Sequence, residues 1–254
     1  MKNKITHIIS LSYSLAKANF KVRNEASYLG ILWYLLSPLS FFLIILHLRT
    51  TLSLDQGIEH YPVYLLLGLI MVNFFSQSVA SSIDIIRSNA NYIKTMKVNY
   101  EVFILSTVFR ATFSHLFELV LVGVTLALLD LSLFGVIYYI PILVLYFFFT
   151  LGVCFLFSAI GVYFNDLKNL WTIASQLLLF ATPVFYLVKE ESPLHSLNLF
   201  NPLFGFLAAA RDVTIYGTLP SLQLILVLIA VSVFFSALGL FIFNRLKRSF
   251  AELV

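Results

Sequence analysis

The sequence has too few charged residues for a protein that is surrounded by water. Only 11% of its 254 residues are Asp, Glu, Lys or Arg, whereas 60% are hydrophobic. Soluble domains are roughly 25% charged, and they need those charges to cover a surface that faces water. Most of the surface of this protein must therefore face lipid, and the short polar stretches leave no room for a separate soluble domain.

Motifs for nucleotide, metal and hydrolase chemistry are also absent from the sequence. No glycine precedes a lysine, so the phosphate-binding pattern GxxxxGK[ST] cannot occur. There is no HExxH, the five histidines are scattered, and no serine sits in GxSxG. We therefore expect no catalytic residue, no bound metal and no cofactor on this chain. ATP and Mg²⁺, if they drive it, must be bound by a partner ATPase.

Cysteine is nearly absent, and a signal peptide is not recognisable. The single Cys154 lies in an apolar run and cannot form an intrachain disulfide. The opening MKNKITHIISLSYSLAKANFKVR lacks the apolar core and small-residue cleavage site of a secretory signal. We expect the first transmembrane helix to direct insertion.

Long apolar runs are what the sequence has in place of charge. A helix needs about 20 mainly apolar residues to cross a bilayer, and barrel strands would instead alternate over about ten residues. The runs do not alternate, so we predict an all-α integral membrane protein with one membrane domain, residues 30–243, and a tail, residues 244–254. The six expected transmembrane helices are Gly30–Leu48, Tyr61–Ile86, Phe103–Leu129, Phe134–Phe164, Leu170–Val188 and Leu222–Phe243.

Lys and Arg in the connections predict the orientation, since cytoplasmic loops carry the excess of basic residues. Of the 16 basic residues, Arg49, Lys189 and Arg211 lie on one side and Arg110 lies within a span. Both termini are therefore predicted to be cytoplasmic, and the net charge of +4 needs no nucleic acid to explain it. The twelve residues on the predicted cytoplasmic side are Lys2, Lys4, Lys17, Lys21, Arg23, Arg87, Lys94, Lys97, Lys168, Arg245, Lys247 and Arg248.

The N-terminal segment, residues 1–29, is too polar to span. Its apolar residues approximate one helical face, which predicts an amphipathic helix lying in the membrane interface. A loosely ordered basic tail is the alternative. The residues of that face are Ile5, Ile8, Ile9, Leu15, Ala16 and Phe20.

The connection Lys189–Ser221 contains a second apolar stretch that cannot span. Asn201-Pro202 is followed by LFGFLAAA, which is too short to cross a bilayer. Irregular backbone lies at membrane depth only where protein or water shields it. We expect re-entrant helices on the external side before the last span, with an ordinary loop and one surface helix as the alternative.

The third span contains three ionisable residues, Arg110, His115 and Glu118. Burying such a group in a bilayer costs at least ~2.5 kcal/mol, so each raises the question of function. Arg110 and Glu118 are about 12 Å apart along a helix and cannot pair directly. We expect structural roles, with transport or subunit contacts as the alternative. So few ionisable groups argue against a proton-coupled carrier.

Aromatic residues make up 16% of the chain, and the first and fifth spans each carry several of them. Aromatic faces stack on the apolar C–H faces of sugar rings, while phenol and indole groups form hydrogen bonds. A path for a glycan could therefore be lined without charges. Core packing and interfacial belts are the alternatives. The candidate path residues are Trp33, Tyr34, Phe41 and Phe42 in the first span and Phe180, Phe185 and Tyr186 in the fifth.

Three stretches together resemble a known family. NFKVRNEASYLGILWYLLSPL, residues 19–39, is similar to the opening of permeases in type-2 ABC exporters of polysaccharide. FNDLKNLWTIASQLLLFATPVFY, residues 164–186, resembles their fourth cytoplasmic turn and fifth helix, and NPLFGFLAAARDVTIYGTLP, residues 201–220, resembles their re-entrant region. The tail FNRLKRSFAELV is similar to their ending. The matching residues are Arg23, Leu29, Gly30, Trp33 and Pro38 in the first stretch, Asp166, Leu167 and Pro183 in the second, and Asn201, Pro202, Arg211 and Asp212 in the third.

The resemblance implies a homodimer of permeases bound to two ABC ATPase subunits in the cytoplasmic (inner) membrane. It implies export of an undecaprenyl-linked glycan such as O-antigen, capsule or teichoic acid, with the third stretch as a re-entrant gate. The connection RSNANYIKTMKVNYE would place a short helix in a groove of the ATPase, unless it is a solvated loop. The candidate coupling residues are Asn91, Tyr92, Lys94, Thr95 and Met96.

Other classes of function stay open at this level. A permease of the same kind could export drugs or small lipids, and ATPase stimulation by a drug would distinguish it. A membrane enzyme that acts on lipid would need clustered polar groups. A purely structural membrane subunit would purify without an ATPase.

Overall fold

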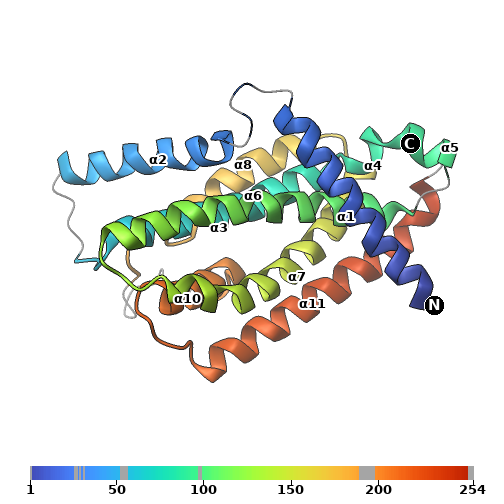
Figure 1. The fold of residues 1–254 in the computed structure, drawn as a ribbon. Helices are drawn as coiled ribbons and strands as arrows, with labels where there is room; N and C mark the ends of the chain where they lie inside the picture. Colours follow the sequence, from blue (N-terminus) through green and yellow to red (C-terminus); the bar gives the residue numbers. More distant parts are fainter. Residues whose placement is uncertain are drawn as a thin grey trace.

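The computed structural model describes residues 2–25, 28, 30, 32–51, 57–96, 99–188 and 198–250. Within these residues every regular element is a helix, and the longest helices run side by side as an elongated bundle (Figure 1). The predicted all-α fold is therefore confirmed. The elements are α1 (Lys2–Glu25), α2 (Leu32–Thr51), α3 (Tyr61–Ile83), α4 (Ile85–Ser88), α5 (Ala90–Met96), α6 (Tyr100–Leu128), α7 (Phe134–Tyr163), α8 (Leu167–Ala181), α10 (Pro202–Thr214), α11 (Leu222–Leu246) and the 3₁₀ turn η1 (Lys247–Ser249).

Four helices of the described part are long and apolar enough to cross a membrane, which makes the chain a multi-pass membrane protein. They correspond to the second, third, fourth and sixth predicted spans. The apolar part of α2 is shorter, Leu35–Thr51, and α8 has only 15 residues. The count of six spans therefore stays a prediction. The four long helices are Tyr61–Ile83, Tyr100–Leu128, Phe134–Tyr163 and Leu222–Ser249.

The fifth predicted span, Leu170–Val188, is wrong as a continuous helix, because α8 ends at Ala181. Thr182 is extended, with φ −80° and ψ 135°. Pro183 follows it, and the proline ring disfavours the helical conformation of the residue before it. A helix of 15 residues is about 22 Å long, short of the ~30 Å hydrocarbon core. An irregular segment, residues 182–188, continues the chain.

The core of the bundle is centred on α3, which is buried over most of its length. The Tyr146 hydroxyl of α7 donates to the carbonyl oxygen of Met71 at 2.9 Å. Phe75 of α3 stacks on Phe149 of α7 with ring centroids 5.4 Å apart. These contacts fix α3 against α7, and α2, α6 and α8 also pack against α3.

Two glycines let α7 and α11 cross in backbone contact. A Cβ on Gly239 would overlap the carbonyl oxygen of Gly152. The Ser232 and Ser236 hydroxyls of α11 donate to the carbonyl oxygens of Leu145 and Phe148 on α7, at 2.9 and 2.8 Å. Small residues and hydroxyl hydrogen bonds of this kind hold helices together in lipid, where hydrophobic burial provides little driving force.

The predicted N-terminal helix is present as α1, which slants across α6 (Figure 1). Phe20 stacks on Phe117 of α6 with centroids 5.7 Å apart, and Tyr13 meets Phe113 edge-on. Among its described side chains, Ser12 and Ala16 are buried, and Ala16 belongs to the predicted apolar face. The place of α1 in the membrane interface stays a prediction.

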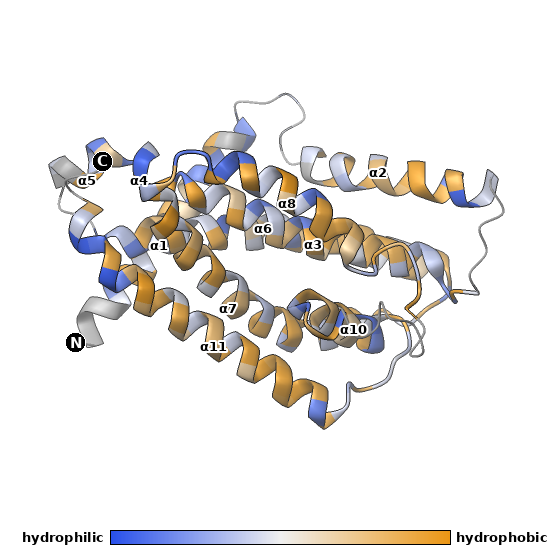
Figure 2. Cartoon of the chain, turned by 180° about the vertical axis from the view of Figure 1, so that it is seen from behind, coloured by the Kyte–Doolittle hydropathy of each residue, from blue (hydrophilic) through white to orange (hydrophobic). Residues whose placement is uncertain are grey.

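Both termini and α5 lie at the same end of the bundle (Figure 1). Hydrophilic residues gather at this end around α4 and the C-terminus (Figure 2). Two ion pairs lie here, between Lys168 and Asp84 and between Lys247 and Glu101, each with nitrogen and oxygen 2.7 Å apart. The arrangement agrees with the predicted cytoplasmic side, which stays a prediction.

Candidate functional site

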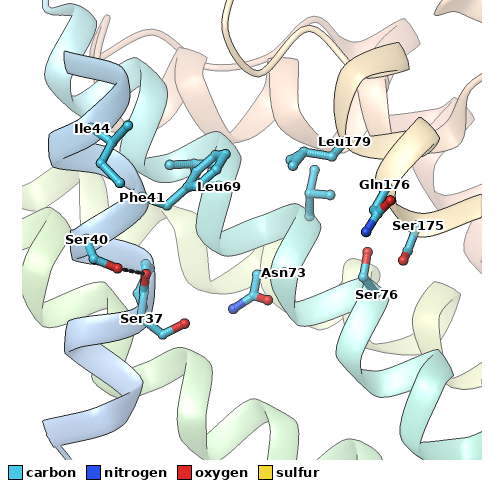
Figure 3. A pocket seen from close by; sticks show the side chains of 12 residues that line it. Ser37, Ser40, Phe41, Ile44, Leu69, Asn73, Ser76, Ser175, Gln176 and Leu179 are labelled. Carbon is cyan, nitrogen blue, oxygen red and sulfur yellow. Dashed lines mark hydrogen bonds between the residues drawn. The ribbon is translucent and has the colours of Figure 1, made fainter. Parts of the chain in front are cut away.

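A groove with a volume of about 480 Å³ lies between α2, α3 and α8. Figure 3 shows Asn73 and Ser76 of α3 facing it, with Ser175 and Gln176 of α8 opposite them. Asn73, Ser76, Ser175 and Gln176 thus form a polar floor, and Ser37 and Ser40 of α2 add further hydroxyl groups. The lining is apolar at Phe41 and Ile44 of α2, at Leu69 and Val72 of α3 and at Leu179 of α8. Its lining is Ser37, Pro38, Ser40, Phe41, Ile44, Leu69, Val72, Asn73, Ser76, Ser175, Gln176 and Leu179.

The open face of α3 is polar or small throughout. Between Val63 and Ile83 the only residues that are not buried are Asn73, Ser76, Gln77, Ala80 and Ser81. Their spacing of three or four residues places them on one face of the helix. Polar side chains within a membrane face the bundle interior or a water-filled cavity, not lipid. This face of α3 therefore suits water or a polar ligand.

The exposed surface of α11 shows what a lipid-facing helix of this protein looks like. Val233, Phe234 and Phe241 are each well exposed there. Such residues are absent from the open face of α3, although both helices are long and apolar enough to span. The contrast separates a lipid-facing surface on α11 from a polar surface on α3.

Three of the predicted aromatic residues meet at the end of the groove. The ring centroids of Phe41 and Phe185 are 6.2 Å apart, and those of Phe180 and Phe185 are 5.6 Å apart. Phe41 is 37% exposed and lines the groove, and Phe180 is 61% exposed. The structure thus joins α2 and the end of α8 through a partly exposed aromatic cluster.

The other predicted path residues lie elsewhere. Trp33 is exposed in the first turn of α2 but does not line the groove. Phe42 is 6% exposed and packs in the core, because successive residues of a helix point about 100° apart. The Tyr186 hydroxyl donates to the carbonyl oxygen of Phe180 at 3.1 Å. The side chain of Tyr34 lies outside the described residues.

Arg211 of α10 fixes the irregular segment after α8. Its Nη1 donates to the carbonyl oxygen of Pro183 at 2.9 Å, and its Nη2 to those of Tyr64 at 3.1 Å and Val184 at 3.4 Å. The guanidinium lies 3.2 Å from the centroid of the Tyr64 ring. Gly68 makes this approach possible, because a Cβ there would lie 3.1 Å from Nη2.

Other side chains also bond to this irregular segment and connect it to α10. The Tyr64 hydroxyl donates to the carbonyl oxygen of Tyr186 at 2.9 Å. Asn201 Nδ2 donates to Thr182 Oγ1 at 2.9 Å, while its Oδ1 caps α10 by accepting from Leu203 N. Pro202 then occupies the first turn of α10, where its missing N–H is not needed. Side chains thus bond to several groups of this segment, as irregular backbone needs where water is absent.

The helix α10 covers only the first half of α7. Phe206 packs on Tyr146 near the middle of α7, with ring centroids 5.0 Å apart. At its other end, Thr214 lies against Gly135 in the first turn of α7. Asp212 is partly exposed near this end. The predicted re-entry of this segment into the membrane stays a prediction.

The ionisable residues of α6 all contact neighbouring helices. Arg110 Nη2 donates to Ser81 Oγ at 3.3 Å. Glu118 Oε2 lies 3.4 Å from Nδ1 of His115, and the Nε2 of His115 is 2.9 Å from the Tyr139 hydroxyl. These contacts agree with the structural interpretation. Within the described residues, no three His, Cys, Asp or Glu side chains group closely enough to hold a metal ion.

The predicted short cytoplasmic helix is present as α5. Asn91, Tyr92 and Thr95 are exposed on it, whereas Ile93 packs against the core. The side chains of Lys94 and Met96 lie outside the described part of the chain. Three of the five candidate coupling residues therefore form an accessible surface at the end of the bundle that carries both termini.

Sequence reasoning found the aromatic end of the groove and missed its polar floor. Asn73 and Gln77 were not singled out, nor were the groove serines. A signal was present, since Asn73, Ser76, Gln77, Ala80 and Ser81 recur at helical spacing within an otherwise apolar run.

The fold and the groove together define a multi-pass membrane protein with a polar, aromatic-ended surface inside its helical bundle. The sequence profile of a family described as ABC-2 type transporter matches residues 11–215. The chain belongs to the ABC-2 type transporter family, and it is a membrane subunit of a transporter and not an enzyme.

Characterised relatives match over nearly the whole chain. It is 28% identical over 259 residues to the O-antigen export system permease protein RfbA of Klebsiella pneumoniae, covering 100% of this chain and 98% of the relative. It is 26% identical over 246 residues to the O-antigen export system permease protein RfbA of Myxococcus xanthus, covering 95% of this chain and 94% of the relative. The predicted family is confirmed.

Proposed function

We propose that this chain is the transmembrane subunit of an ATP-driven exporter that moves lipid-linked polysaccharide across the cytoplasmic membrane. Relatives named as O-antigen export permeases match it over almost their full length. The observation that carries the proposal is the polar open face of α3 beside the exposed rings of Phe41 and Phe180. Sugars present both hydroxyl groups and apolar C–H faces, and this surface offers partners for both.

The path is formed by two copies of the chain. A polar face at membrane depth is costly against lipid, so something other than lipid must cover the groove. A second copy that presents the same groove encloses a polar path between α2, α3 and α8 of both subunits. Among the residues that the structure describes, no Lys, Arg, Asp or Glu lines the groove. A moving polymer therefore meets many weak contacts and no charged site that would trap it.

The energy comes from two ATPase subunits that bind ATP and Mg²⁺ and dock at α5. Their contact surface includes Asn91, Tyr92 and Thr95. The segment that precedes α5 is tied to α8 by the ion pair between Asp84 and Lys168. Movement of α5 is thus transmitted to α8, which forms one wall of the groove. The complex with an open groove and the complex with a closed groove bind ATP with different affinities. ATP binding therefore shifts the populations of the two states.

The irregular segment after α8 and the half-helix α10 form the external gate. Arg211 and Asn201 connect them, and neither residue reaches the groove lining. The lipid carrier is undecaprenyl-based, and its tail stays in the bilayer while the glycan passes. Opening at the external side requires these contacts to move together.

Glycan export per assembled complex tests the proposal. We expect Phe41→Ala to reduce export while membrane insertion and assembly with the ATPase are retained, because Phe41 is on the groove surface and partly exposed. Phe234→Ala on the exposed surface of α11 is the matched control and leaves export unchanged. Unchanged export in Phe41→Ala, or ATPase stimulation by a drug and not by lipid-linked glycan, refutes the proposal.

A further inference from the structure

A buried carboxyl group stands behind the polar floor of the groove. Glu118 of α6 is 4% exposed, and its Oε1 accepts a hydrogen bond from Asn73 Nδ2 at 3.4 Å. Asn73 Oδ1 in turn accepts from Gln77 Nε2 at 2.9 Å. Asn73 lines the groove, and Gln77 is exposed one turn further along α3, where it lines a smaller pocket between α3 and α6. A chain of hydrogen bonds therefore leads from a buried acid to the open face of α3.

We propose that Glu118 is a positioning residue that orients the Asn73 and Gln77 amides for the hydroxyl groups of the passing glycan. A carboxyl acceptor selects the NH₂ end of Asn73, and this leaves the carbonyl end of Asn73 to select the NH₂ end of Gln77. Gln77 Oε1 is then the group left for a ligand, and it accepts hydrogen bonds from hydroxyl donors. The inference rests on the proposed function, since it assumes that the cargo is a sugar.

The other oxygen of the carboxyl group lies near His115. Oε2 of Glu118 lies 3.4 Å from Nδ1 of His115, whose Nε2 is 2.9 Å from the hydroxyl of Tyr139. Tyr139 is completely buried, so this arm does not reach the groove. Glu118 therefore lies between His115, which contacts Tyr139 of α7, and the polar face of α3.

Packing alone does not account for this arrangement. A buried polar network is often no more stabilising than apolar side chains of the same volume. The amides of Asn73 and Gln77 could each rotate to present either end if nothing selected one. The carboxyl group fixes the orientation of both amides. A Gln77 oxygen that is already oriented can bind a sugar hydroxyl without the loss of side-chain entropy that ordering it would cost.

The test uses the purified complex with its ATPase, in vesicles, and undecaprenyl-linked O-polysaccharide as the probe. The measurement is the probe concentration that gives half-maximal stimulation of ATP hydrolysis. Glu118→Leu and Asn73→Ala are each expected to raise it about fivefold, the effect of one net hydrogen bond. The double variant is expected to raise it about fivefold as well, because both changes interrupt the same chain. Glu118→Gln is expected to restore the wild-type value, since its amide oxygen still accepts from Asn73.

Two control variants separate positioning from stability. Tyr139→Phe removes only the hydroxyl group that contacts His115. It should lower the melting temperature and leave the probe concentration for half-maximal stimulation unchanged. Ser106→Ala alters another buried residue of α6, whose hydroxyl bonds only to Phe103 O of the same helix. It should leave half-saturation unchanged. Gln77→Ala, at an exposed position, keeps the test valid if Glu118→Leu does not assemble. It too should raise the probe concentration for half-maximal stimulation about fivefold.

The outcomes distinguish this inference from the proposed function. Wild-type half-saturation in Glu118→Leu or in Gln77→Ala overturns the positioning role while the proposed function stands. A double variant whose effect is the product of the two single effects also overturns it. A wild-type complex that the lipid-linked glycan does not stimulate overturns the proposed function itself.

Discussion

Arg211 is the residue on which the irregular segment after α8 depends. It donates to carbonyl oxygens of Pro183 and Val184 in that segment and of Tyr64 on α3, and it covers the Tyr64 ring. Three parts of the chain far apart in sequence therefore meet at one guanidinium. Its planar, forked donors suit this task, and a lysine could not reproduce them.

We predict that Arg211→Met destabilises the protein by about 3 kcal/mol, because buried carbonyl groups lose their donor. Arg211→Lys should restore only part of that loss. Thermal unfolding of the detergent-solubilised protein measures both effects. Arg49→Met is the matched control, since Arg49 also covers a tyrosine ring, that of Tyr61, at a partly exposed position. It should cost about 1 kcal/mol or less. Equal stability of Arg211→Met and wild type would show that the segment is held by other contacts.

Some of these residue contacts could not be predicted from the sequence. The resemblance pointed to Arg211, but its partners on α3 lie 147 positions away and follow from no local pattern. Phe42 looked equivalent to Phe41 from composition alone, and only the packing of α2 separates the buried ring from the exposed one. Asn73 and Gln77 could have been found from helical spacing.

At the scale of elements, the contact between α7 and α11 is set by glycine. A Cβ on Gly239 would overlap the backbone of Gly152. We predict that Gly239→Leu separates the two helices and costs about 3 kcal/mol, the upper part of the range for overpacking. Gly123→Leu on α6 is the control, because a Cβ there meets nothing within 4 Å. The yield of folded protein after detergent extraction measures the difference, and equal yields would contradict the close crossing.

The helix α5 provides a second prediction at this scale. Tyr92 is 57% exposed, so Tyr92→Ala should weaken association with the ATPase, or uncouple hydrolysis from export, without unfolding the permease. Ile93→Ala is the comparison, because Ile93 packs on the core and its loss should affect stability instead. Copurification of the ATPase and export per complex give the two readouts. Normal association and normal export in Tyr92→Ala would rule out α5 as the coupling surface.

Long elements were predictable from the sequence, and the ends of short ones were less so. The helices α3, α6, α7 and α11 follow from the length and apolar character of their runs. The end of α8 was missed although Pro183 marks it, because hydropathy stays high through the break while the backbone does not stay helical. The half-length of α10 was indicated by its short apolar stretch.

At the scale of the whole molecule, the two ends of the bundle differ in chemistry, and this predicts the topology. In a Cys154→Ser background, Thr218→Cys should react with a membrane-impermeant maleimide added outside the cell. Thr95→Cys should react only after the membrane is opened, because it lies on α5 at the end with both termini. Both positions are exposed, so accessibility within the protein does not explain a difference. External labelling at position 95 would reverse the orientation.

The central claim is that the glycan passes along the polar and aromatic groove of α2, α3 and α8. The most direct measurement is photo-crosslinking of lipid-linked glycan in the complete complex while it hydrolyses ATP. A photoreactive amino acid replaces either Phe41 in the groove or Gln77 on the adjoining open face of α3, with Phe234 on the exposed surface of α11 as the reference position. The account predicts glycan adducts at positions 41 and 77 that depend on ATP, and none at position 234. Adducts at 234 with none at 41 and 77 would contradict it.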